Sequence, residues 1–138
     1  MLDRAVVGLL RRVLYLKALE AFLGGLGLAV VPRFLLVTVL GQPEYPDYAL
    51  VRVLGVADVA LALLLVLVAQ RVQEMWWWSW AFVVLTGGTA AVVTLHTAFG
   101  LPPGASPWMW VGLAAFSWAI AFGLLWGLAR AATEAPPQ

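Results

Sequence analysis

The sequence predicts an all-α integral membrane protein, a four-helix bundle that forms a single transmembrane domain over residues 1–138. Hydrophobic residues make up 64% of the chain and charged residues only 11%, which leaves too few polar side chains to cover a soluble domain. The apolar residues gather in four stretches, each about as long as the roughly 20 residues that a helix needs to cross a bilayer. The predicted helices cover about residues 13–31, 49–69, 75–99 and 108–130.

The first predicted helix follows a basic N-terminal segment and ends before Pro32. Lys17 and Glu20 interrupt its apolar run, which favours a retained helix over a cleaved secretory signal. The apolar stretch at 33–40 is too short to span a bilayer. It is expected to lie at the membrane interface or to extend the first helix beyond a kink at Pro32.

Polar or proline-rich segments separate the remaining helices. The loop at 42–48 contains two prolines and two acidic residues, as expected where a chain turns at the water boundary. The short polar turn at 70–74 predicts that the second and third helices are antiparallel neighbours, and an uncharged turn at 100–107 precedes the fourth. Most tryptophans lie near helix ends, as in an interfacial aromatic belt. Trp118 alone is predicted in mid-membrane, where its N–H needs a hydrogen-bond partner.

The distribution of basic residues predicts the orientation of the helices. The side that carries both termini holds six basic residues: Arg4, Arg11, Arg12, Lys17, Arg71 and Arg130. The opposite side holds two, Arg33 and Arg52. Because basic residues are retained on the cytoplasmic side, both termini are expected in the cytoplasm, with the protein in the inner or plasma membrane. The formal net charge of +1 provides no basic patch, so no nucleic-acid partner is expected.

Three ionisable side chains are expected at membrane depth: Lys17 and Glu20 in the first helix and Asp58 near the middle of the second. A charge there costs about 2.5–3.5 kcal/mol on insertion scales, so each needs a partner, a proton or water. Glu20 and Asp58 should lie at similar depth, and Lys17 shares a helix face with Glu20. We therefore predict one buried polar cluster, which is either a structural network or a site that accepts protons or binds a headgroup. Lys17 neutralises only one carboxyl, and the other then needs a proton or Arg52.

A second polar cluster is predicted on the outer side, with Arg52 at the start of the second helix and His96 near the end of the third. His96 is a candidate axial ligand for haem or chlorophyll, or a hydrogen-bond donor to a quinone carbonyl. The alternative is an interface histidine bonded to a loop carbonyl. A single His without any Cys does not make a classical zinc site, so no metal is expected.

The order of features along residues 13–70 carries a resemblance to a known group. A glycine-rich first helix ends at Pro32, the apolar stretch RFLLVTVLG follows, and the second helix opens with Arg-x-x-Gly at Arg52 and Gly55. In these features the chain resembles the DoxX-like small four-helix membrane proteins. The group is similar in fold rather than in activity, and some members are membrane subunits associated with quinone-linked oxidoreductases. The resemblance implies no catalytic residue and gives no role to Asp58.

The sequence contains no nucleophile-elbow or phosphate-loop motif, so a stand-alone enzyme is not expected. It predicts a membrane protein without its own catalytic centre, acting as an accessory or binding subunit of a membrane redox or transport complex. One alternative is a small proton-linked transporter that uses Glu20 and Asp58, and another is a quinone- or lipid-binding membrane protein. The expected partners are the lipid bilayer and either other membrane subunits or further copies of the chain.

Overall fold

The computed structural model describes residues 2–134, and helices account for most of that range. Seven helical segments follow one another in the described part of the chain: α1 (Arg4–Val30), η1 (Phe34–Val39), α2 (Ala49–Gln70), α3 (Val72–Met75), η2 (Trp76–Trp78), α4 (Ser79–Phe99) and α5 (Pro107–Glu134). No strand occurs in residues 2–134, so the predicted all-α class is confirmed for them.

Four helical stretches are long and apolar enough to cross a membrane, and they indicate an integral membrane protein: Arg4–Val30, Ala49–Gln70, Val72–Phe99 and Pro107–Glu134. This agrees with the four helices expected from the sequence. Their bounds differ most at the N-terminus, because α1 begins at Arg4 rather than near residue 13. The basic segment is helical since it contains no proline and buries Val6, Val7 and Leu10 in the core.

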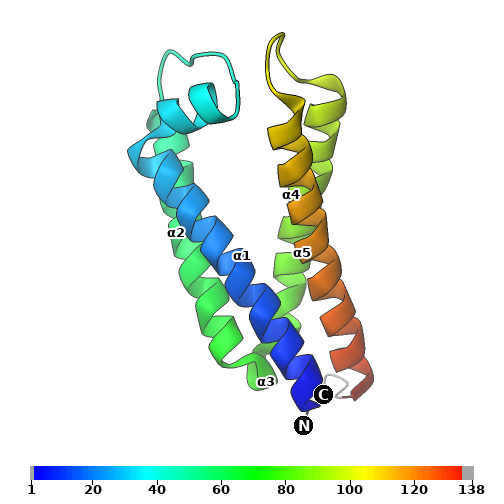
Figure 1. Ribbon diagram of the computed structural model, residues 1–138. Coiled ribbons are helices and arrows are strands. Elements are labelled where there is room, and N and C mark those ends of the chain that lie inside the picture. Colours follow the sequence, from blue (N-terminus) through cyan, green and yellow to red (C-terminus); the bar gives the residue numbers. More distant parts are fainter. Residues whose placement is uncertain (1, 135–138) are drawn as a thin grey trace.

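Pro32 ends α1, and a short π-helix follows it. In η1 the chain is wound more widely than in an α-helix, and the N–H of Leu40 donates to the carbonyl of Leu35 at 3.0 Å. Gly41 then adopts a φ of +65°, a conformation that glycine takes without steric cost. Figure 1 shows η1 lying across the ends of α1 and α2, at the opposite end of the molecule from the start of α1.

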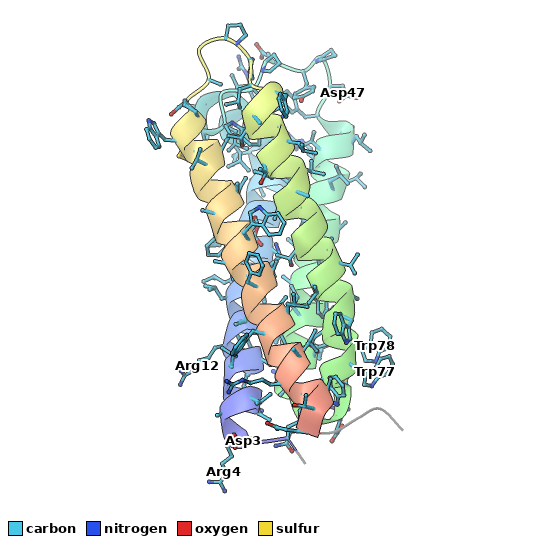
Figure 2. All side chains as sticks on the ribbon, turned by 90° about the vertical axis from the view of Figure 1, so that its right-hand side faces the viewer. Asp3, Arg4, Arg12, Asp47, Trp77 and Trp78 are labelled. Carbon is cyan, nitrogen blue, oxygen red and sulfur yellow. The ribbon has the colours of Figure 1, made fainter. Side chains whose placement is uncertain are left out.

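The helices form two antiparallel hairpins. α1 packs mainly on α2, and α4 packs mainly on α5, while α1 also packs on α5 and so joins the hairpins. Figure 1 shows the hairpins converging where α1 begins and α5 ends, which we call the terminal end. They diverge toward the opposite end, which we call the loop end. Figure 2 labels Asp3 and Arg4 at the terminal end and Asp47 at the loop end.

The hydrophobic core reflects this divergence, because it is split into two clusters. The larger cluster fills the terminal half, where Leu10, Leu14, Leu65, Leu124 and Leu128 are fully buried. The smaller cluster lies at the loop end and consists of Val93, Trp110 and Ala114, with Leu40, Leu101 and Leu113 packed against it. Side-chain packing therefore holds the hairpins together mainly in the terminal half.

The backbones of α1 and α2 meet at Gly25 and Gly55. A Cβ atom placed on Gly25 would lie 2.7 Å from the carbonyl oxygen of Gly55, and one placed on Gly55 would lie 2.5 Å from the carbonyl oxygen of Gly25. A Cβ atom at Gly55 would also lie 2.5 Å from the nitrogen of Ala29. Small residues allow this approach in membrane proteins, where close packing replaces the hydrophobic effect as the main force between helices.

This contact predicts that Gly25→Ala lowers stability, because the added methyl group can be accommodated only by separating α1 from α2. We expect a loss of about 1–3 kcal/mol, the usual cost of overpacking. The control is Gly24→Ala at the adjacent position, where a Cβ would have no neighbour within 4 Å. That variant should be as stable as the wild type or slightly more stable, since alanine favours the helix. Unfolding in detergent, followed by circular dichroism, measures both, and equal stability of the two variants would contradict the close contact.

Candidate intramembrane polar site

Lys17 and Glu20 form an ion pair on α1. They are three residues apart, which places both side chains on one helix face, and the Nζ atom of Lys17 donates a hydrogen bond to Oε2 of Glu20. The side chain of Lys17 is 7% exposed and that of Glu20 is 29% exposed. The ammonium group is therefore enclosed by protein and neutralised by a carboxylate that reaches the surface of the chain.

Asp58 is held beside α1 by the glycine contact. A Cβ atom on Gly25 would lie 2.8 Å from the Cβ atom of Asp58, so the Asp58 side chain starts from the side of α2 that meets α1. Asp58 is half-buried, and the charges of both Glu20 and Lys17 act on its carboxyl group. Within residues 2–134 this carboxyl has no hydrogen bond or ion pair. The structure thus brings the three predicted residues into one region but pairs only two of them.

Three buried hydroxyl groups add to the polar groups inside the bundle. Ser79, Thr86 and Ser117 are each buried, and among the described residues their hydroxyl groups have no hydrogen-bond partner. Serine and threonine in helices usually donate to the carbonyl four residues earlier, as Thr94 does here to Ala90 at 2.7 Å. Because that local bond is the ordinary outcome, a hydroxyl in an apolar helix gives no sequence signal that it is unpaired.

The position of Ser117 relative to the polar cluster follows from the α1–α5 seam. Leu10 packs against Gly127 and Val13 packs against Gly123, which fixes the antiparallel register of the two helices. In that register Ser117 lies at about the height of Glu20. The ion pair and the unpaired hydroxyl therefore occupy the same level of the bundle.

Arg52 and His96, predicted as a second cluster, have different surroundings. The Nε2 atom of His96 accepts a hydrogen bond from the side-chain amide of Gln42 at 3.2 Å, and its ring lies 4.5 Å from that of Trp110. Arg52 is exposed on α2 and makes no contact with His96 among the hydrogen bonds and ion pairs of residues 2–134. Ligation of haem or chlorophyll through Nε2 of His96 requires displacing Gln42.

The loop-end residues connect the two hairpins. Nε1 of Trp110 on α5 donates to the carbonyl of Leu40, which follows η1, at 2.8 Å. With the Gln42–His96 bond, this ties the segment after α1 to α4 and α5. Trp118, which was expected to need a partner in mid-membrane, donates to the hydroxyl oxygen of Thr94 at 3.0 Å. These contacts give His96 and the two tryptophans structural roles in the described chain.

The two ion pairs of residues 2–134 provide a matched comparison of burial. We expect Glu20→Gln to destabilise the protein by roughly 2–4 kcal/mol, because it leaves the buried Lys17 ammonium without a counter-charge. Glu44→Gln breaks the pair with Arg33, whose side chains are 71% and 59% exposed, and should cost less than about 1 kcal/mol. Chemical unfolding of both variants in the same detergent measures the difference. Similar losses for the two variants would show that Lys17 does not depend on Glu20.

Comparisons of the chain with protein-family models, with curated proteins and with solved structures each returned no match. The DoxX-like resemblance of residues 13–70 therefore stays a prediction from the sequence.

Proposed function

We propose that this chain is an accessory or binding subunit of a membrane redox or transport complex, without a catalytic centre of its own. The observation that carries the proposal is the Asp58 carboxyl, which lies in the middle of a candidate membrane span without a partner in residues 2–134. A polar group at that depth costs several kcal/mol unless it is paired. A cation or hydrogen-bond donor of a second membrane subunit satisfies this requirement.

The surfaces of the spans support the same proposal. Only 22–33% of the most apolar part of each span is buried within the chain, so most of the helix surface is available to lipid or to other helices. The hairpins share a core mainly in the terminal half, which leaves much of α1 and α2 toward the loop end without cover from α4 and α5. A second subunit can therefore approach the level of Asp58 without unfolding the bundle.

The acidic pair supports a second candidate function, that of a small proton-linked carrier. Glu20 and Asp58 lie in the same region, and Lys17 neutralises only one of them when all three are ionised. Carboxyl groups at membrane depth often carry protons in pumps and transporters. In this function Asp58 takes up and releases the proton, while Glu20 stays paired with Lys17.

Substitution of Asp58 tests the two functions against each other. If a second subunit binds there, the wild-type chain purified in mild detergent should elute with a second polypeptide at fixed stoichiometry, and Asp58→Leu should lose it. Arg52→Gln, an exposed change on the same helix, is the control and should retain it. Light scattering and intact-mass measurement provide the readout.

A wild-type chain that elutes with detergent and lipid alone contradicts the subunit proposal. In that case proton flux into proteoliposomes, followed with a pH-sensitive dye, becomes the decisive measurement. Flux that Asp58→Asn abolishes establishes the carrier, and equal flux in wild type and variant rules the carrier out.

The orientation of the chain is part of the proposal, with both termini in the cytoplasm. Arg33 and Arg52 lie toward the loop end, while Arg4, Arg11, Arg12, Arg71 and Arg130 lie toward the terminal end, in keeping with the rule for cytoplasmic loops. Lys17 is midway along α1. Single cysteines placed at two exposed sites test the orientation, since the chain has none of its own. In intact cells an impermeant thiol reagent should label Ser106→Cys and not Gln73→Cys. The reverse pattern would mean that the chain is inserted the other way round.

A further inference from the structure

An apolar groove runs along the outer side of the α1–α5 seam, in the terminal half of the bundle. It has a volume of about 550 Å³ and is lined by Leu9 of α1 and by Phe122, Gly123, Leu125, Trp126 and Ala129 of α5. This volume is in the range of roughly 300–1,000 Å³ typical of sites that hold small molecules. Because Gly123 and Ala129 have little or no side chain, the groove is open along α5 and suits a flexible hydrocarbon chain.

Two arginines stand beside this groove. The guanidinium carbon of Arg130 lies 5.0 Å from the ring centre of Trp126, which lines the groove, so a cation–π contact holds this charge at its edge. Arg12 follows Leu9 by three residues on the same face of α1, and the α1–α5 register places it about level with Leu125. Figure 2 shows the Arg12 side chain pointing outward from the bundle.

The charges of these arginines are unmatched within the described chain. The ion pairs of residues 2–134 are Lys17–Glu20 and Arg33–Glu44, and neither includes Arg12 or Arg130. By contrast, Arg11 on the other side of α1 is engaged, since its Nε atom donates to the carbonyl of Ala69 at 3.1 Å. Two free guanidinium groups, that of Arg12 alongside an apolar groove and that of Arg130 at its terminal end, are complementary to a molecule with an anionic head and an apolar tail.

We infer that this groove is a binding site for an anionic phospholipid, with one acyl chain along α5 and the phosphate between Arg12 and Arg130. The guanidinium groups bind the phosphate oxygens, and Trp126 packs on the first carbons of the chain while keeping Arg130 in place. The site is independent of Asp58 and of the proposed subunit function. It differs from general attraction to an acidic membrane surface because it requires both the groove and these two arginines.

The test uses the full chain, stripped of lipid in detergent and then titrated with dioleoyl phosphatidylglycerol or dioleoyl phosphatidylcholine. Native mass spectrometry measures the fraction of chains with one bound lipid. We expect phosphatidylglycerol to bind at least about tenfold more tightly, and the double variant Arg12→Gln/Arg130→Gln to lose this preference. Ala129→Phe, which fills the groove, should weaken the binding of both lipids.

Two matched variants make the result specific. Arg4→Gln/Arg71→Gln removes the same charge from exposed positions outside the groove and should keep the preference for phosphatidylglycerol. Ala60→Phe makes the same apolar change at an exposed position of α2 and should bind lipid like the wild type. If Arg12→Gln/Arg130→Gln does not fold, as judged by circular dichroism, two other variants take its place in the same lipid titration. These are the conservative double variant Arg12→Lys/Arg130→Lys and the groove variant Ala129→Phe.

Several results would overturn the inference. Equal binding of the two lipids by the wild type, or an equal loss in Arg4→Gln/Arg71→Gln, would reduce it to general surface charge. Displacement of phosphatidylglycerol by millimolar inorganic phosphate would indicate a phosphate site without a role for the groove. Full binding by Ala129→Phe would exclude the acyl chain from the groove, and dimerisation that Ala129→Phe abolishes would make the groove a contact between two copies.

Discussion

The contact between the backbones of α1 and α2 at Gly25 and Gly55 is the constraint on which the rest of the structure depends. A Cβ atom on either glycine would overlap backbone atoms of the other helix. The two glycines must therefore face each other, and this fixes the position of α2 along α1. That position sets Asp58, less than one turn after Gly55, against α1 and within the electrostatic range of Glu20. The polar region at membrane depth is thus a consequence of this close contact between α1 and α2.

The two hairpins are joined by different forces at their two ends. In the terminal half, buried aliphatic side chains of α1 and α5 interlock, with Leu10 against Gly127 and Val13 against Gly123. At the loop end, a few hydrogen bonds link the segment after η1 to α4 and α5. Hydrogen bonds of this kind contribute about 1 kcal/mol each, whereas the interlocked side chains of the terminal half make many dispersion contacts at once. The two hairpins are therefore held together by extensive side-chain packing in the terminal half and by a few hydrogen bonds at the loop end.

The charged groups divide into those that the chain satisfies itself and those that it leaves for other molecules. Lys17 is enclosed and neutralised by Glu20, and such a pair is costly to break once it is buried. Asp58 and the arginines beside the α1–α5 groove have no such partner in residues 2–134. These unpaired groups lie at two depths, and they are the groups on which the proposed partner subunit and the proposed lipid site depend.

The sequence alone determined the fold class and most of the helix positions, because long apolar runs broken by Pro32, by the polar turn at 70–74 and by the turn at 100–107 leave few other solutions. It also predicted that Glu20 and Asp58 lie at similar depth and that Lys17 shares a helix face with Glu20, since depth and face follow from the rise and turn of a helix. Only the tertiary structure decided that Lys17 pairs with Glu20 and that His96 contacts Gln42 rather than Arg52. The choice of Glu20 over Asp58 as the partner of Lys17 depends on where α2 packs on α1, and the partner of His96 depends on where the segment after η1 lies against α4. Those placements result from contacts between segments that are far apart in the sequence, such as the contact of Gly25 with Gly55.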